Sequence, residues 1–296
     1  MPHDLVTTEW SWLIVLYFFV GGIAAGAYFI AALLELVGEP QDLAAVRVAH
    51  LIAFPLAAVC GVLLIADLGR SERFWHMIVQ SETARPMLKW WSPMSFGSWL
   101  LLVFSGMAFL SFVDALVERG RGRAFLHRSG FGKLWALAGS LVGLLFASYT
   151  GVLLSNSNFP VWMNSTWIGA LFMASAVSTG LATVALFLRL RQRYPLGTRH
   201  KLEEADSYAM LLELVLIVVF VISLGAFAFP FLTHPLGAIL LWGGVVVLGL
   251  LVPLGLHFLW PRALGSVGAV LAPILTLAGG LILRLVVVVM PQGVFG

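Results

Sequence analysis

Eight long runs of apolar residues occupy most of this chain, and short polar segments separate them. A transmembrane helix needs about 20 predominantly apolar residues to cross a hydrocarbon core about 30 Å thick, so each run is long enough to span a bilayer. The chain is 60% hydrophobic and 10% charged, which is more apolar surface than one soluble core can bury. The sequence therefore predicts an integral membrane protein. The expected spans are residues 12–36, 46–66, 96–117, 134–154, 167–188, 208–230, 236–260 and 264–290.

The composition of the runs indicates α-helices. They are continuous and rich in Leu, Ala and Gly, whereas the strands of a membrane barrel alternate apolar and polar residues. No soluble domain, low-complexity tract or long linker interrupts them, so we expect an all-α membrane protein with one membrane domain over residues 1–296. The first run lacks the basic segment and cleavage site of a signal peptide and is expected to be retained.

Lys and Arg residues are distributed unequally between the two sets of loops. The loops after the first, third, fifth and seventh spans hold 12 of them, and the other side holds four, all in one loop. The positive-inside rule places the side with 12 in the cytoplasm, so both termini are expected outside, in the periplasm. The 12 are Arg47, Arg119, Arg121, Arg123, Arg128, Lys133, Arg189, Arg191, Arg193, Arg199, Lys201 and Arg262; the four are Arg70, Arg73, Arg85 and Lys89.

Charge and cysteine content exclude other functions. The pI near 9.3 reflects basic residues in short loops beside membrane spans, without the basic and aromatic stripe of a nucleic-acid-binding surface, so no nucleic-acid partner is expected. The single cysteine, Cys60, allows no internal disulfide and cannot hold an iron–sulfur cluster, which takes about four ligands. Electrons passing through this protein would need a partner to carry them onward.

The longest segment between spans, residues 67–95, is unusually rich in aromatic and charged side chains. An aromatic belt with arginines reaching to the bilayer surface would explain the tryptophans. It explains less well the acid, arginines and histidine on the side that usually avoids positive charge, so we expect a docking surface for a partner. The expected docking residues are Arg73, Trp75, His76, Trp90 and Trp91, with Trp162 in the later segment 155–166; segment 231–236 could extend the surface.

Several motifs resemble the polysulfide reductase membrane-anchor family, also called the NrfD type, which supplies quinone-reactive membrane subunits of bacterial respiratory complexes. They occur in the family's order over the first five spans, while the last three match mainly by hydrophobic pattern. The motifs are Trp10-Ser11-Trp12 through Tyr17, Gly21-Gly22 through Gly26, Asp67-Leu68-Gly69-Arg70, Arg73-Phe74-Trp75-His76, Trp91-Ser92-Pro93-Met94-Ser95, Ser148-Tyr149-Thr150-Gly151 through Ser155, and Pro160-Val161-Trp162.

This resemblance implies two four-helix bundles, at about residues 12–154 and 167–290, in the bacterial inner membrane. It implies a quinone, menaquinone or ubiquinone, bound near the outer face, with no metal or haem in this protein. It also implies a four-cluster, ferredoxin-like iron–sulfur partner joined to a molybdenum-type catalytic subunit; a multihaem cytochrome is the alternative partner. The protein would then react with quinone without converting the soluble substrate itself.

The expected quinone site lies between the outer ends of the first four spans. Tyr17 and Tyr149 are each about five residues inside the outer boundary, roughly 8 Å deep, where two hydroxyls could donate to quinone carbonyls. Asp67 and Arg70 lie above them as an acid–base pair, and Asp67 could exchange protons. The alternatives are a phenol bonded to a nearby backbone, a tyrosine of the aromatic belt, and an acid that caps the loop or pairs with an arginine. Trp12, Ser155 and Arg284 are candidates for supporting this pocket.

Ionisable residues within membrane spans are costly and are functional candidates by default. Besides Asp67, the candidates for a proton path are Glu213, Glu35, His50, Asp114 and His257. Glu35, His50 and Asp114 lie near the inner boundary, where they could reach water or pair with loop arginines. We expect quinone protons to be exchanged at Asp67, because Glu213 is expected in the inner third with no titratable residue between the two.

Two other classes of function stay open on sequence alone. A b-type haem could be held by His50 and His257. A secondary transporter could use helices broken at Pro55, Pro253 and Pro273 or at the glycine pairs Gly243-Gly244 and Gly279-Gly280. Close helix packing is the competing explanation for glycines, as at Gly22-x-x-x-Gly26 and Gly139-x-x-x-Gly143.

Overall fold

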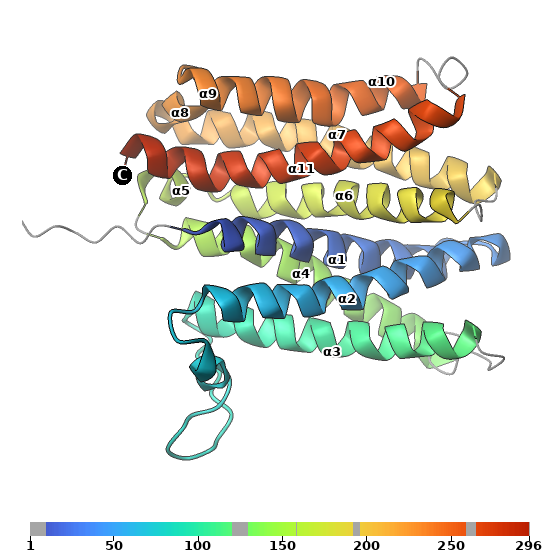
Figure 1. Cartoon of the computed structure of the whole chain (residues 1–296), viewed down its shortest axis with the longest axis horizontal. Helices are drawn as coiled ribbons and strands as arrows, with labels where there is room; N and C mark the ends of the chain where they lie inside the picture. The colour runs from blue at the N-terminus through green and yellow to red at the C-terminus, as the bar shows by residue number, and fades with distance from the viewer. Residues whose placement is uncertain (1–9, 120–129, 158, 192–195, 259–264, 296) are drawn as a thin grey trace, which may run out of the picture.

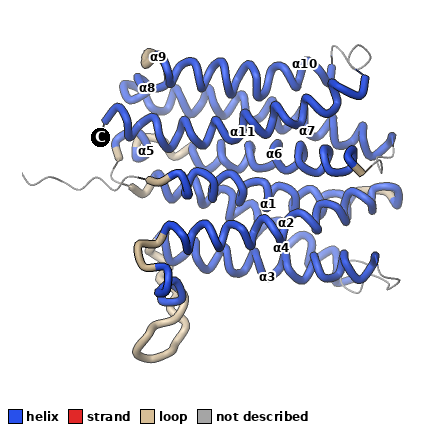
Figure 2. The backbone as a smooth tube through the Cα atoms, viewed as in Figure 1, coloured by secondary structure: helices blue, strands red, loops and turns tan. Residues whose placement is uncertain are grey.

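A computed structural model describes residues 10–119, 130–157, 159–191, 196–258 and 265–295. This part of the chain is nearly all helical (Figures 1 and 2), and the bridge between Val79 and Pro86 is isolated. The elements are α1 (Trp12–Val37), η1 (Pro40–Asp42), α2 (Leu43–Asp67), η2 (Ser71–Met77), α3 (Pro93–Arg119), α4 (Gly130–Ser155), α5 (Pro160–Met163), α6 (Ile168–Leu190), α7 (Leu196–Leu224), η3 (Gly225–Ala228), α8 (Phe229–Leu232), α9 (Pro235–Ala238), the π-helix η4 (Ile239–Leu251), α10 (Val252–Phe258) and α11 (Gly265–Phe295).

Eight stretches within the described residues are long and apolar enough to cross a membrane, which confirms the predicted multi-pass helical protein. Several boundaries differ from the prediction by a few residues, and two of the differences affect the site. The sixth span begins at Leu196 rather than near residue 208, because α7 continues into a charged segment that the hydrophobic pattern could not include. The last span runs on to Phe295, since α11 continues through Pro291.

The spans alternate in direction, so α1 begins and α11 ends at the same end of the molecule (Figure 1). The segment between α2 and α3 projects from this end, which we call the outer end; the opposite end is the inner end. Arg199 and Lys201, predicted to be loop residues, lie instead in the first turns of α7 at the inner end. Arg121, Arg123, Arg128, Arg193 and Arg262 fall outside the described residues.

Helices α1 and α6 form the centre of the molecule. Helix α1 packs on α2 and α4, α3 packs on α2 and α4, and α11 packs on α6, η4 and α10. Contacts of α6 with α1 and α4 join the first half of the chain to the second, and Figure 1 shows the two halves one above the other.

Glycines bring the central helices into backbone contact. A Cβ atom on Gly26 would lie 1.9 Å from the carbonyl oxygen of Ala176 and 3.1 Å from Cα of Gly180. On α4, the faces of Gly139 and Gly143 receive the rings of Tyr28 and Phe104. Small residues permit such close approach of membrane helices, so the packing explanation for these glycines is confirmed.

Polar contacts connect distant segments at both ends. At the inner end, the buried Asp42 carboxylate of η1 accepts hydrogen bonds from Thr198 (2.7 Å) and Lys201 (2.9 Å) of α7. At the outer end, the backbone N–H of Trp10 donates to the Gln292 side chain of α11 at 2.7 Å. These contacts fix the first half of the chain against the second.

Candidate functional site

The outer ends of α1 and α2 are joined through Ser11 and Asp67. Ser11 is the N-cap of α1, and its hydroxyl accepts from the backbone N–H of Leu13 and donates to Oδ1 of Asp67, the last residue of α2. A capping hydroxyl satisfies one of the free N–H groups at a helix start. The same contact holds the Asp67 carboxylate over the α1–α2 boundary, where it is partly exposed.

Tyr17 and Tyr149 lie deeper than Asp67 and close to one level. Tyr17 is five residues into α1, and Tyr149 is six residues before the end of α4, so each is about 8–9 Å from the outer end of its helix. Both phenols are almost completely buried. The ring of Tyr17 meets Phe146 edge-on at 6.1 Å, one turn before Tyr149 on α4. The two tyrosines therefore border the same contact between helices.

The hydroxyl of Tyr149 donates to the backbone carbonyl of Pro93, the first residue of α3, at 2.5 Å. Its ring fits over Gly97, where a Cβ atom would come within 2.2 Å of the ring and hydroxyl. A ligand that accepts a hydrogen bond from Tyr149 would have to share or replace this backbone acceptor. Such a backbone partner is the alternative that the sequence leaves open for this phenol.

Arg70 and Arg73 are exposed at the start of η2. Among ion pairs between described residues, none joins either arginine to Asp67. The carboxylate of Asp67 contacts Ser11 instead of the arginine that the sequence offered as an alternative partner, and both guanidinium groups are exposed.

Helix η2 and the segment after it project from the outer end (Figure 1) and carry exposed aromatic side chains. The rings of Trp75 and His76, both in η2, are tilted against each other with centroids 3.8 Å apart, and Trp90 meets Trp91 edge-on with Trp90 77% exposed. We call residues 70–91 the outer loop. Its tryptophans are available to a partner, as a docking surface requires.

Trp162 does not belong to that surface, which corrects the sequence prediction. It is 1% exposed, its indole N–H donates to the carbonyl of Val287 on α11 at 2.8 Å, and its ring contacts Trp10 and Phe159. The short helix α5 turns this side chain inward, so Trp162 connects α5 to α11.

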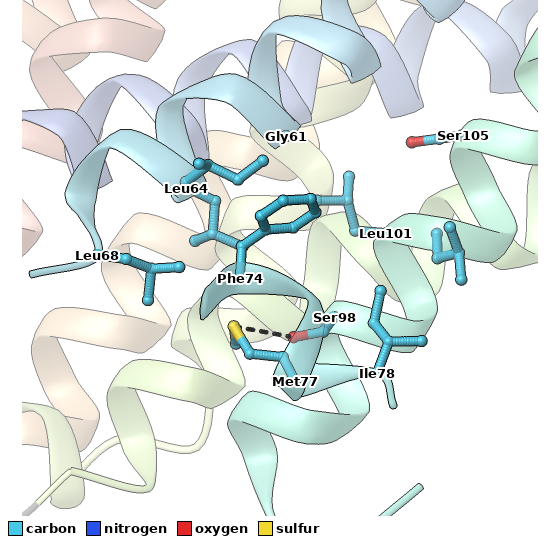
Figure 3. A pocket seen from close by; sticks show the side chains of 11 residues that line it. Gly61, Leu64, Leu68, Phe74, Met77, Ile78, Ser98, Leu101 and Ser105 are labelled. Carbon is cyan, nitrogen blue, oxygen red and sulfur yellow. Dashed lines mark hydrogen bonds between the residues drawn. The ribbon is translucent and has the colours of Figure 1, made fainter. Parts of the chain in front are cut away.

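An apolar groove lies directly beneath η2 (Figure 3). Phe74 and Met77 of η2 and the following Ile78 cover the groove. Its other walls are α2, with Leu64 and the following Leu68, and the facing side of α3. Its volume is about 180 Å³, and Ser98 and Ser105 are the polar side chains in its lining. Sequence reasoning did not find this groove, because its walls come from three segments and each wall alone reads as lipid-facing surface.

The three residues expected to support the pocket have separate surroundings. Trp12 is 62% exposed on the outside of α1, and the Ser155 hydroxyl donates to the carbonyl oxygens of Gly151 and Ser165. Arg284 is not near the outer level as expected. Because α11 continues to Phe295, Arg284 lies 11 residues from the helix end, about 16 Å deep.

Arg284 of α11 is fully buried against α6 and α1. Its Nη1 donates to the Ser175 hydroxyl at 2.6 Å and to the Gly280 carbonyl at 2.9 Å, and the guanidinium lies 5.4 Å from the ring centroid of Phe172. Gly22 of α1 leaves room for it, since a Cβ there would lie 2.9 Å from Nη2. Its charge is thus held by polar groups inside the protein, away from lipid.

Glu213 lies near the middle of the sixth span, Leu196–Ala228, which corrects the expectation that it sits in the inner third. Its carboxylate accepts from the Ser178 hydroxyl at 2.7 Å. Ser175 and Ser178 are three residues apart on α6, so one helix face carries the partners of both Arg284 and Glu213. A buried polar network therefore crosses from α11 through α6 to α7.

A second acid continues toward the inner end. Asp206 is buried two turns before Glu213, and its Oδ1 has no hydrogen-bond partner among the described residues. It lines a cavity of about 20 Å³ with Arg189, Glu203 and His257, room for about one water. The spacing of seven residues between Asp206 and Glu213, which puts two acids on one helix face, is a sequence signal that could have found it.

The other ionisable candidates have local partners. Glu35 and His50 form a buried pair at 2.8 Å, and the ring of His50 lies 5.1 Å from that of Tyr28. Asp114 is buried on α3. His257 lies on α10, where its Nδ1 is 3.4 Å from the Ser207 hydroxyl, whereas His50 lies on α2 with Glu35, so the two histidines have separate partners. Within the described residues, no group of three or more His, Cys, Asp or Glu side chains is placed to hold a metal ion.

The helices expected to be broken in a transporter are continuous at their prolines. Helix α2 passes through Pro55 and α11 through Pro273, while Pro253 lies in the first turn of α10 after the π-helix. Gly249 and Gly279 pack against each other at the η4–α11 crossing. Pro55 and Pro273 therefore do not break their helices, whereas Gly243-Gly244 lies within the π-helix.

Fold and composition define a multi-pass helical protein of the membrane, with a buried polar layer and a projecting outer loop. Comparison with known proteins gives the family. The family described as "Polysulphide reductase, NrfD" matches residues 2–296, and the protein belongs to it. In bacteria such a protein is located in the inner membrane.

Three relatives match most of the sequence. NrfD of Escherichia coli K12 is 28% identical, covering 93% of this protein and 92% of its own length. The C subunit of polysulfide reductase from Wolinella succinogenes is 26% identical, covering 94% and 92%. The NrfD homolog of Haemophilus influenzae Rd is 26% identical, covering 86% and 84%.

Proposed function

We propose that this protein is the membrane-anchor subunit of a respiratory oxidoreductase complex and that it oxidises or reduces a quinone near its outer end. The observation that carries the proposal is the arrangement of Asp67 with Ser11 one layer above Tyr17 and Tyr149. Family membership and the name of the Wolinella relative, a subunit of polysulfide reductase, support it.

The residues of this layer match what quinone chemistry needs. Each carbonyl oxygen of a quinone accepts hydrogen bonds. Two-electron reduction to the quinol takes up two protons, and oxidation of the quinol releases them. Tyr149 would donate to one carbonyl in place of Pro93, and Tyr17 would line the opposite side. Asp67, partly exposed at the end of α2, would exchange the protons with water outside.

The groove beneath η2 suits the apolar tail of menaquinone or ubiquinone. Its lining is apolar apart from Ser98 and Ser105, and it extends down the α2–α3 surface toward lipid. A prenyl tail lying there would place its ring near the outer ends of α2 and α3. The outer loop, which covers the groove through Phe74, would then connect quinone binding to partner docking.

The electron partner in this proposal is a four-cluster, ferredoxin-like iron–sulfur subunit, itself joined to a molybdenum-type catalytic subunit; a multihaem cytochrome is the alternative. It would dock on the outer loop. The eight spans would form two four-helix bundles in one membrane domain, with both termini in the periplasm by the distribution of Lys and Arg. Purifying the complex in mild detergent and identifying its subunits, clusters and quinone tests this assignment.

A second candidate function is supported by the network between Arg284 and Glu213. With Asp206 and the small cavity at His257, it places titratable groups from the middle of the membrane to the inner end. Such residues inside a membrane protein are typical of proton paths. Quinone chemistry at the outer end could then be coupled to proton movement across the membrane.

Replacing Tyr149 with Phe is expected to weaken quinone-linked turnover up to about tenfold, because loss of one hydrogen bond costs about 0.5–1.5 kcal/mol. Steady-state turnover with a soluble quinol, and inhibitor affinity, measure this effect. Tyr28→Phe is the matched control, since Tyr28 is also buried and its hydroxyl lies 3.0 Å from that of Ser111, far from the outer layer. Equal turnover and inhibitor affinity in wild type and Tyr149→Phe would remove Tyr149 from the site.

Reversing the charge of Arg73, by Arg73→Glu, is expected to release the partner subunit while the helices stay folded. Arg73 is exposed on the outer loop, and rim charges govern association and its salt dependence. Co-purification at several salt concentrations measures the release. Arg191→Glu changes an exposed arginine at the inner end and should leave the complex intact. A wild-type yield of partner with Arg73→Glu would contradict the docking assignment.

A further inference from the structure

A second apolar groove runs along the inner half of the molecule, away from the quinone layer. Helices α1 and α7 form its walls, and α6, on which both pack, forms its floor. The deeper part has a volume of about 410 Å³ and the part nearer the inner end about 270 Å³. The two parts share Ile30, Leu33, Leu181, Ala205 and Tyr208, so they are one continuous groove.

The spacing of the lining residues explains the groove. On α7 it follows one helix face through Lys201, Ala205, Tyr208 and Leu212, and on α1 one face from Ile30 to Val37. Small side chains at positions 174, 205 and 209 leave the space open. From Lys201 to Leu212 the groove extends about 16 Å, about half of a hydrocarbon core 30 Å thick. Its length is that of one leaflet.

Charged groups occur only at one end of the described lining. Lys201 and Glu204 border the inner mouth, and the Tyr208 hydroxyl donates to Glu204 at 3.3 Å. The Lys201 ammonium has three donor hydrogens. Asp42 and Glu39 take two of them, at 2.9 and 3.4 Å, and Lys201 stays 37% exposed. One cation and one anion thus face the mouth of an otherwise apolar groove.

We propose that this groove binds a zwitterionic phospholipid with a primary ammonium group, with its acyl chains between α1 and α7. The phosphate would accept from Lys201, and the ammonium would donate to Glu204. A net anionic headgroup fits less well, because Glu39, Asp42 and Glu204 outnumber Lys201 at the mouth. The bound lipid would fill the space between the first and second halves of the protein. This inference is independent of the proposed quinone chemistry.

The test uses the full-length protein with its co-purifying subunits in mild detergent. After delipidation, native mass spectrometry follows titration with phosphatidylethanolamine, phosphatidylglycerol and phosphatidylcholine that have identical acyl chains. Wild type should retain one phosphatidylethanolamine per protein molecule, with about tenfold weaker retention of the other two, a difference of about 1.4 kcal/mol. Equal retention of phosphatidylglycerol would overturn the headgroup assignment.

Two variants locate the lipid. Ala205→Phe fills the groove and should abolish retention, whereas Val218→Phe adds the same ring on an exposed face of α7 that does not line the groove and should retain the lipid. Glu204→Gln should remove the preference for phosphatidylethanolamine over phosphatidylglycerol. Wild-type retention in Ala205→Phe, or a cross-link that places a partner's helix in the groove, would refute the proposal.

Discussion

Replacing Asp67 with Asn is expected to lower quinone-linked turnover about a hundredfold, the lower end of what general acid–base catalysis contributes. Asn preserves the size of the side chain and an oxygen that accepts from Ser11, but it cannot exchange a proton. The pH dependence of turnover should change with it, because the titrating group is removed. Steady-state kinetics over a range of pH measure both effects.

Two comparisons make this result specific. Ser11→Ala removes the helix cap and the hydrogen bond to Asp67 but leaves the acid, so turnover should fall much less. Glu213→Gln should leave turnover largely intact, since Glu213 lies at mid-membrane, away from the outer layer. Glu213→Gln could instead stop turnover or abolish charge movement in sealed liposomes. Either result would mean that protons cross the membrane through the network of Arg284 and Glu213, and the proposal that protons are exchanged only at the outer end would be wrong.

Gly26→Ala is expected to destabilise the protein by about 3 kcal/mol or more, as overpacking of a tight contact does. The added methyl group would lie 1.9 Å from the Ala176 carbonyl oxygen, which is backbone and cannot rotate away. Helices α1 and α6 would have to separate, and with them the two halves of the protein. Thermal unfolding in detergent and the yield of folded protein measure the loss.

Gly106→Ala is the control, because nothing lies within 4 Å of a Cβ atom at that position on α3. Ala is the better helix former by about 1 kcal/mol, so this variant should be neutral or slightly stabilised. An equal loss in both variants would show that the close α1–α6 crossing is not what makes Gly26→Ala destabilising.

The sequence by itself determined the class of this protein and the elements that cross the membrane. Hydrophobic length is a local property, and a bilayer allows almost only helices for such runs, so the eight spans could be predicted without contacts. The layer of Tyr17 and Tyr149 could also be predicted, because depth follows from counting residues along a helix.

Only the tertiary structure decided which side chains meet. Arg284 lies deeper than its apolar run predicts because α11 continues to Phe295, and Ser175 and Ser178 of α6 bring Arg284 and Glu213 into one network across three helices. Trp162 turns inward to α11 although its motif reads as surface. Both grooves depend on residues far apart in the sequence. Hydropathy indicates which residues of a helix lie in the hydrocarbon core, whereas packing against neighbouring helices decides which way each side chain faces.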